Sequence, residues 1–301
     1  MDALLFLAAA VRISVPYALA AMGASLSERG GVVCIALEGI MLTGALGYTV
    51  GAHLSGNPWA GVAAALAVGA FMAWLHAEAT VRFRADQITS GLGLNLLAAG
   101  LTRFVLVQVF HSSSNSSRVA GLPQWHVPVL DGIPGIGALV GSPLVLATAA
   151  LVVLVHRLLF RTVFGLRLRA TGERPEASAT LGLSVRGIRF AGVLLCGLLA
   201  GLAGAYLASE QHSFTDGMTG GRGYIALAAM IVGKWNPVGA AAACLLFGAA
   251  EALQIQLQGS GFPSELLQAL PYVVTMLVLA GFIGRAVAPR AVGVPYDPEV
   301  Q

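Results

Sequence analysis

The stretch "PWAGVAAALAVGAFMAWLHAEAT", residues 58–80, decides the fold class, because it stays apolar for longer than a helix in a soluble core usually does. An α-helix needs about 20 such residues to cross the hydrocarbon of a bilayer. The whole chain has this character, since hydrophobic residues make up 57% of its 301 residues and charged residues only 10%. Soluble domains contain about 25% charged residues. The sequence therefore predicts an all-α, polytopic membrane protein.

Similar apolar runs occur along most of the chain. They predict about eight full spans in a single transmembrane domain covering residues 1–301, at 4–24, 31–54, 58–80, 87–110, 138–160, 188–208, 237–257 and 266–285. The segment "GGRGYIALAAMIVGKWNP", at 220–237, has an apolar centre that is too short for a full crossing, and Lys234 and Pro237 end it. We expect this segment to be a broken or re-entrant helix.

Arginine positions predict the orientation, because cytoplasmic loops retain Arg and Lys during insertion. Seven arginines lie between Arg157 and Arg189, so the loop at about 161–187 is expected inside. If the segment 220–237 counts as a crossing, the N-terminus is outside and the C-terminus inside. The first apolar run lacks a basic start and carries Arg12 in its middle, so we expect a retained span rather than a cleaved signal peptide.

The chain lacks the motifs of the common enzyme classes. Its only lysine, Lys234, is followed by Trp235, so there is no phosphate-binding G-x-x-x-x-G-K-[ST] loop, and no G-x-S-x-G elbow occurs. Six histidines and three cysteines are spaced too widely to indicate a metal site. No basic and aromatic surface suggests nucleic acid. We expect no catalytic residue, metal or bound cofactor, and we attribute the net charge of +3 to arginines that face anionic lipid or a partner protein.

Polar side chains inside the predicted spans are candidates for a solute pathway. Glu38 lies within the second span, where a carboxylate is costly and normally faces a cavity or a partner, so a pathway role is favoured. Asn95 lies in the fourth span. Glu251 and Gln254 lie three residues apart and share a helix face. For these three residues, hydrogen bonding between helices is an equally good interpretation. Arg103, nearer the end of its span, is expected to extend to the interface.

The glycine-rich start of the segment 220–237 supplies two further candidates, Arg222 and Tyr224. The glycines are expected to open the broken helix so that its first N–H groups point into the pathway. A structural capping role for Arg222 and Tyr224 stays equally open.

The loop at 161–187 contains "GERPEASATLGL", Gly172 to Leu183. Pro175 suits the first turn of a helix and Gly182 the position just past its end, which predicts a helix of about two turns. So short a helix is marginal in water, so we expect a partner to hold it; a solvated turn is the alternative. The spacing of Glu176, Ala177, Ser178 and Gly182 resembles the E-A-A-x-x-x-G loop of ABC importer permeases. In that family the loop forms a coupling helix that docks on the ATP-hydrolysing subunit.

Several stretches together resemble the sugar and nucleoside branch of ABC importer permeases, which is related to ribose and branched-chain amino acid permeases. They are "SERGGVVCIALEGIML", "ITSGLGLNLLAAGL", "RATGERPEASATLGL", "GMTGGRGYIALAAMIVGKWNPVGA" and "LPYVVTMLVLAGFIGR". The order holds from about residue 12 to residue 299, and the likeness is strongest to nucleoside-type permeases. The chain departs from the family pattern N-I-G-x-E-G at Cys34 and Ala36, which puts the exact solute in question.

The resemblance implies the permease subunit of an importer in the bacterial plasma membrane, for a nucleoside or a simple sugar. It implies a separate ABC ATPase that uses ATP, and an external solute-binding lipoprotein of the basic-membrane-lipoprotein type. It also implies a second permease subunit, for which a different chain is favoured over a second copy of this one. The aromatic rings of Tyr206, Tyr224 and Trp235 suit the flat base of a nucleoside. The alternative is an ion-coupled secondary transporter with Glu38 or Glu251 as proton carrier, although the two halves show no convincing inverted repeat.

Overall fold

The computed structural model describes residues 3–125, 136–258 and 287–297, together with single positions between 266 and 277. Within these residues the chain is helical, and an isolated bridge between Asn115 and Thr215 is its only β-type pairing. The all-α prediction is therefore confirmed for the described part of the chain. The helices are α1 (Ala3–Arg29), α2 (Leu37–Ser55), α3 (Pro58–Ala77) with its π-helical extension η1 (Glu78–Arg82), α4 (Gln87–Phe110), α5 (Ile136–Gly141), α6 (Pro143–Arg161), α7 (Val163–Glu173), α8 (Pro175–Thr180), α9 (Val185–Gln211), α10 (Arg222–Val232) and α11 (Pro237–Leu257).

Six of the described helices are long and apolar enough to cross a membrane. They are α1, α3 with η1, α4, α6, α9 and α11, and they correspond to six of the predicted spans. The predicted span 266–285 lies outside the described residues apart from single positions. α10 has 11 residues, so it rises only about 16 Å. It is shorter than the hydrocarbon of a bilayer, in agreement with the broken helix predicted there.

The predicted span 31–54 is partly wrong, because its first residues are not helical and α2 begins only at Leu37. Side chains from other elements satisfy the backbone of this linker. The Val33 N–H donates to Gln87 Oε1 at 2.7 Å, and His76 Nε2 lies 2.9 Å from the Val33 carbonyl oxygen. Non-helical backbone is tolerated inside a membrane bundle only where protein or water supplies such partners. The sequence pattern shows the apolar character of 31–54 but not these distant partners.

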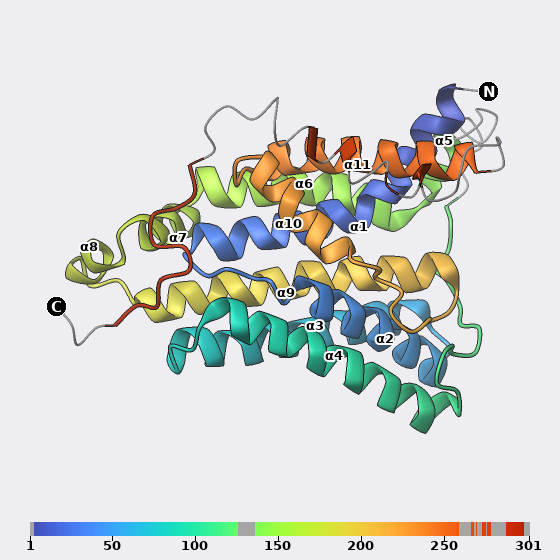
Figure 1. Cartoon of the computed structure of the whole chain (residues 1–301), viewed down its shortest axis with the longest axis horizontal. Helices are drawn as coiled ribbons and strands as arrows, with labels where there is room; N and C mark the ends of the chain where they lie inside the picture. The colour runs from blue at the N-terminus through green and yellow to red at the C-terminus, as the bar shows by residue number, and fades with distance from the viewer. Residues whose placement is uncertain are drawn as a thin grey trace.

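The two ends of the bundle differ (Figure 1). α7, α8 and the segment 287–297 gather at one end, and α1 begins at the other. We call the first the arginine-rich end, because the loop at 161–187 lies there. The segment 287–297 binds several elements at this end: the Ala291 N–H donates to the Gly172 carbonyl at 2.9 Å, and Arg189 Nη1 donates to the Val294 carbonyl at 2.9 Å. Which side of the membrane each end faces stays a prediction.

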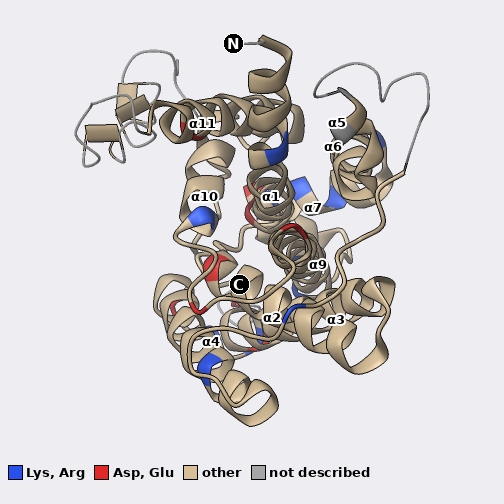
Figure 2. Ribbon diagram, turned by 90° about the vertical axis from the view of Figure 1, so that its right-hand side faces the viewer, with Lys and Arg blue, Asp and Glu red and all other residues tan. Residues whose placement is uncertain are grey.

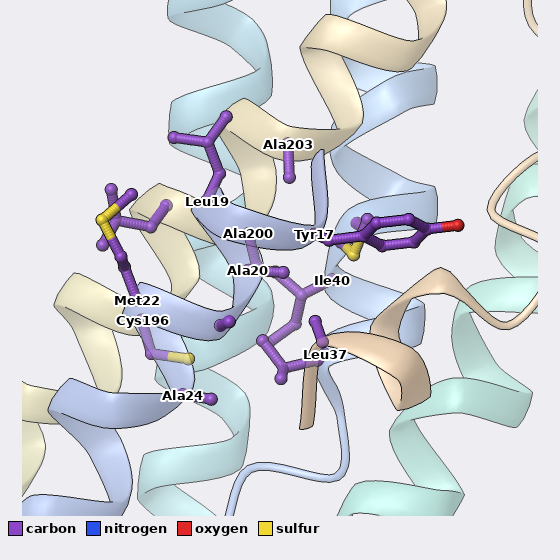
Figure 3. Packing of buried hydrophobic residues seen from close by; sticks show 14 of the residues in the cluster. Tyr17, Leu19, Ala20, Met22, Ala24, Leu37, Ile40, Cys196, Ala200 and Ala203 are labelled. Atoms are coloured by element: carbon purple, nitrogen blue, oxygen red, sulfur yellow. The ribbon is translucent and has the colours of Figure 1, made fainter. Parts of the chain in front are cut away.

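α1 and α9 lie near the middle of the bundle, with the other long helices around them (Figure 2). Figure 3 shows Tyr17, Leu19 and Met22 of α1 packed beside side chains of α2 and α9. Small residues on α9 allow equally close packing against α3. A Cβ added at Gly197 or Gly201 of α9 would lie 2.5 Å from a backbone oxygen of α3. Helices in lipid gain little from burying apolar area, so contact of this kind is what holds them together.

Candidate functional site

Glu38 is half-buried and lies at the start of α10. Its Oε1 accepts a hydrogen bond from the Gly221 N–H at 2.8 Å, and its Oε2 accepts one from the Gly223 N–H at 2.7 Å. The first N–H groups of a helix lack partners within the helix and carry a partial positive charge. The Glu38 carboxylate, from the first turn of α2, therefore caps α10 from another element. A Cβ at position 223 would lie 2.6 Å from the Glu38 nitrogen, so only glycine fits there.

Arg222 joins α10 to α11 and α1. Its Nη2 donates to Glu251 Oε1 at 2.9 Å, and the Tyr17 hydroxyl donates to Glu251 Oε2. The side chains of Arg222 and Glu251 are 27% and 18% exposed. Because both charges are largely withdrawn from water, loss of either partner costs more than in a surface ion pair.

Asn95 of α4 connects three other parts of the chain. Its Oδ1 accepts from the Gly39 N–H at 2.8 Å, and its Nδ2 donates to the Ile35 carbonyl and to the Tyr224 hydroxyl, each at 3.0 Å. An amide side chain has two N–H donors and one carbonyl acceptor, so Asn95 uses every one of these groups.

The structure thus brings together five of the six residues predicted for the pathway. We call Glu38, Asn95, Arg222, Tyr224 and Glu251 the α10 cluster. Gln254 lies one turn further along α11, and among the described residues it makes none of the hydrogen bonds of the cluster. The observed contacts are between protein groups, so contact with a solute stays a prediction. Trp235 lies apart from the cluster, where its Nε1 donates to Glu28 Oε2 at 2.6 Å.

A cavity of about 300 Å³ opens beside the cluster, between α1, α9 and α10. Arg222 belongs to the α10 cluster and also lines the cavity. Tyr206 is another lining residue. Sequence reasoning did not assign a site role to two further lining residues, Arg12 and Glu210, which form an ion pair. Arg12 carried a usable signal, because a charge inside a predicted span is often functional. Glu210 lies just beyond the predicted span 188–208 and had no such signal. Arg103, expected to extend to the interface, is exposed and pairs with Asp216 at 2.7 Å.

The short helix predicted at 172–183 is present as α8, and its docking role stays a prediction. Pro175 is its first residue, and Gly182 follows its end with φ +76°. The Leu183 N–H donates to the Ser178 carbonyl at 3.2 Å and the Gly182 N–H to the Ala179 carbonyl at 2.8 Å. These two bonds are the Schellman pattern that closes a helix C-terminus. The start and the end predicted for this helix are confirmed.

One face of α8 is open to solvent. Glu176, Ala177 and Leu181 are exposed, Leu181 to 80%, whereas Pro175 and Ser178 are buried against the protein. Of the four predicted ATPase-coupling residues, Ser178 therefore faces its own chain, and Gly182 shapes the helix end. A groove of about 410 Å³ runs between α7, α8 and Arg290 beside the open face. Leu181 lines this groove together with Ala177.

The described residues contain no group of three or more His, Cys, Asp or Glu side chains placed to hold a metal ion. The fold and the site define a class of membrane protein: a multi-pass helical bundle with polar groups inside it and a short helix, α8, exposed at one end. Sequence comparison supports this class. Residues 6–279 match the family described as branched-chain amino acid transport system / permease component, and the chain belongs to this family.

Individual relatives match over most of the chain. The nucleoside ABC transporter permease protein NupC of Lactococcus lactis is 43% identical over 297 residues, covering 94% of this chain and 93% of the relative. The guanosine ABC transporter permease protein NupQ of Bacillus subtilis is 40% identical, covering 93% and 92%. The putative glucose ABC transporter permease protein TsgC13 of Haloferax volcanii is 35% identical, covering 83% and 77%. A second guanosine permease of Bacillus subtilis, NupP, is 26% identical, covering 92% and 82%.

Proposed function

We propose that this chain is the membrane-spanning permease subunit of an ABC importer that carries nucleosides across the bacterial plasma membrane. The observation that carries the proposal is the identity of 43% and 40% with two permeases whose names specify a nucleoside and guanosine. The putative glucose permease is less similar, at 35%, which favours a nucleoside over a simple sugar.

ATP is hydrolysed by a separate ATPase subunit, which α8 contacts through Glu176, Ala177 and Leu181. The exposed face of α8 supports this role, as does the absence of a phosphate-binding loop in the sequence. Coupling between the ATPase and the solute pathway must pass through contacts of this kind. α8 is joined to the bundle through α7, whose end the segment 287–297 holds at Gly172.

A second permease subunit completes the pore, and an external lipoprotein delivers the solute. Bacillus subtilis has two permeases named for guanosine, and this chain is 40% identical to one and 26% identical to the other. That difference supports a heterodimer, in which this chain takes the position of NupQ.

The α10 cluster lies beside the pathway, with the N-terminus of the chain outside and the C-terminus inside. Its two carboxylates already have partners: Glu38 accepts from two backbone N–H groups, and Glu251 accepts from Arg222 and Tyr17. Neither arrangement favours a role as a proton carrier, so ion-coupled transport is not the function that we propose.

The test is uptake of radiolabelled guanosine into proteoliposomes that contain the two permeases, the ATPase and the binding lipoprotein. We expect uptake only with ATP on the side of α8, and loss of uptake with an ATPase that binds but does not hydrolyse ATP. Uptake driven by a proton or sodium gradient with no ATPase present would overturn the proposal.

A further inference from the structure

We infer that the cavity between α1, α9 and α10 binds the ribose of the solute, with the Glu210 carboxylate accepting from its two adjacent hydroxyls. This inference rests on the proposed function and adds to it a site and the chemical group recognised there. The cavity is separate from the hydrogen bonds of the α10 cluster, and only Arg222 belongs to both.

The size and the walls of the cavity suit one small solute. A volume of about 300 Å³ is at the lower end of the range of about 300–1,000 Å³ for small-molecule sites. One wall is apolar, formed by Ala9, Ile13 and Pro16 of α1 with Leu207 of α9. Such sites usually combine an apolar wall with a few polar groups that fix the orientation of the ligand. An apolar wall suits the flat base of a nucleoside.

Each charged side chain that lines the cavity already has a partner of opposite charge. Arg12 pairs with Glu210, and Arg222 pairs with Glu251 at 2.9 Å. A phosphate or carboxylate entering the cavity would find no unpaired cation among these groups, and its desolvation would stay uncompensated. The cavity therefore favours a neutral polar solute, such as a nucleoside, over a nucleotide.

Glu210 supplies the hydrogen-bond acceptor. Its Oε2 accepts from Arg12 Nη2, and among the described residues Oε1 accepts no hydrogen bond. An ionised carboxylate has about four lone-pair positions on two oxygens, so it can accept from both hydroxyls of a vicinal diol. Tyr206 lines the same cavity as Arg12 and Glu210 and adds a phenol ring to its wall.

The position of the cavity suits a site that binds the solute early in its passage through the bundle. Its lining residues come from the beginning of α1 and the end of α9, at the end of the bundle opposite α8 (Figure 1). In the orientation that we propose, this end faces outward. A solute bound there also contacts Arg222 at the start of α10, next to the cap formed by Glu38.

The experiment uses the complete membrane complex of both permeases and the ATPase in nanodiscs, without ATP. The soluble binding protein is left out so that only sites within the membrane are titrated. Binding of radiolabelled guanosine is compared with that of 2′,3′-dideoxyguanosine and guanosine 5′-monophosphate. Hydrogen bonds to a charged group are stronger than those to a neutral group. We therefore expect guanosine to bind about tenfold or more tightly than the dideoxy analogue, and the monophosphate to bind no more tightly than guanosine.

The variant Glu210→Gln should reduce this discrimination to about threefold or less, because a neutral amide accepts more weakly than a carboxylate and has one acceptor oxygen in place of two. The double variant Arg12→Gln with Glu210→Gln leaves no unpaired charge and should show the same loss. Glu78→Gln is the matched control, since Glu78 pairs with Arg82 on η1 and does not line the cavity. That control should keep the wild-type discrimination.

Absence of saturable guanosine binding, or unchanged discrimination in both Glu210 variants, would overturn the inference. Uptake of guanosine by the complete importer separates this failure from failure of the proposed function. If uptake is normal while discrimination does not depend on Glu210, only the ribose site is wrong. If no nucleoside is taken up, the proposed function is wrong as well.

Discussion

Two of the short helices of the described chain, α8 and α10, are held in opposite ways. α8 is closed by its own sequence, with Pro175 at its start and the Schellman bonds of Gly182 and Leu183 at its end. α10 is closed by a side chain from far away in the sequence, because Glu38 accepts from the Gly221 and Gly223 N–H groups. This difference in capping follows from the surroundings of each helix. One face of α8 is open to solvent, where water can satisfy what the cap does not. The first turn of α10 is half-buried against α2, and the Glu38 side chain supplies the acceptor for two of its N–H groups.

This difference in capping indicates which of the two helices can move. α8 carries its cap with it, so it can shift with a bound partner without exposing backbone groups. α10 cannot shift at its start without breaking two charge-assisted hydrogen bonds to Glu38. The start of α10 is therefore a fixed point beside the proposed pathway, and the following predictions compare the two helices.

The largest effect is expected for Glu38→Ala. It leaves two backbone N–H groups inside the bundle without their acceptor and should lower the stability by about 3–5 kcal/mol, from two bonds to a charged group. We expect uptake to be lost and the thermal unfolding temperature in detergent to fall clearly. Glu38→Gln keeps one acceptor oxygen and should lie between alanine and wild type. Normal uptake and an unchanged unfolding temperature in Glu38→Ala would show that α10 does not need this cap.

A smaller effect is expected for Gly223→Ala, which changes the same contact from the side of α10. The new Cβ would lie 2.6 Å from the Glu38 nitrogen and 2.8 Å from its Oε2, and overpacking of this kind costs about 1–3 kcal/mol. Gly93→Ala is the matched control, because a Cβ on that glycine of α4 meets nothing within 4 Å. Equal unfolding temperatures for the two variants would contradict the crowded contact.

At the end of α8, a glycine-to-alanine substitution should act only through backbone strain. Gly182 has φ +76° and open space around its Cβ position, so Gly182→Ala should cost about 1–2 kcal/mol of local strain. We expect the helix end to fray and the ATPase rate stimulated by solute to fall, with little change in the unfolding temperature of the bundle. A fall in unfolding temperature as large as that of Gly223→Ala would contradict the local character of α8.

The smallest effect on stability is expected for Leu181→Asp, since Leu181 is 80% exposed. Surface substitutions usually stay within about 0.5 kcal/mol. The predicted consequence is functional: binding of the ATPase subunit, measured by co-purification, should weaken and uptake should fall. Val287→Asp is the control, because Val287 is 76% exposed and does not line the groove beside α8. If the Leu181→Asp variant co-purifies with the ATPase subunit as well as the wild type does, α8 is not the docking site.

Features of the fold that depend only on neighbouring residues could be predicted from the sequence. The length of each apolar run fixed six of the spans, and Pro175 with Gly182 fixed both ends of α8. The start of α2 could not be predicted in this way. Residues 31–36 are as apolar as a helix requires, but partners more than 40 positions away, His76, Gln87 and Asn95, bind their backbone instead.

The candidate site could be predicted as a list of residues but not as an arrangement. Polar residues are rare inside the spans, so Glu38, Asn95 and Glu251 stood out, and the glycines before Arg222 indicated the break. That Glu38 caps the helix that Arg222 begins depends on the approach of α2 and α10, which no sequence period encodes. The cavity walls at Arg12 and Glu210 come from helix packing in the same way.

The account depends most directly on Glu38 as the cap of α10, and amide hydrogen exchange measures that contact. In the wild-type complex the Gly221 and Gly223 amides should be strongly protected. In Glu38→Ala they should exchange about tenfold faster or more, since one lost bond to a charge exceeds about 1.4 kcal/mol. The Gly182 and Leu183 amides at the end of α8 should exchange as in wild type. Unchanged protection at Gly221 and Gly223 would contradict the account.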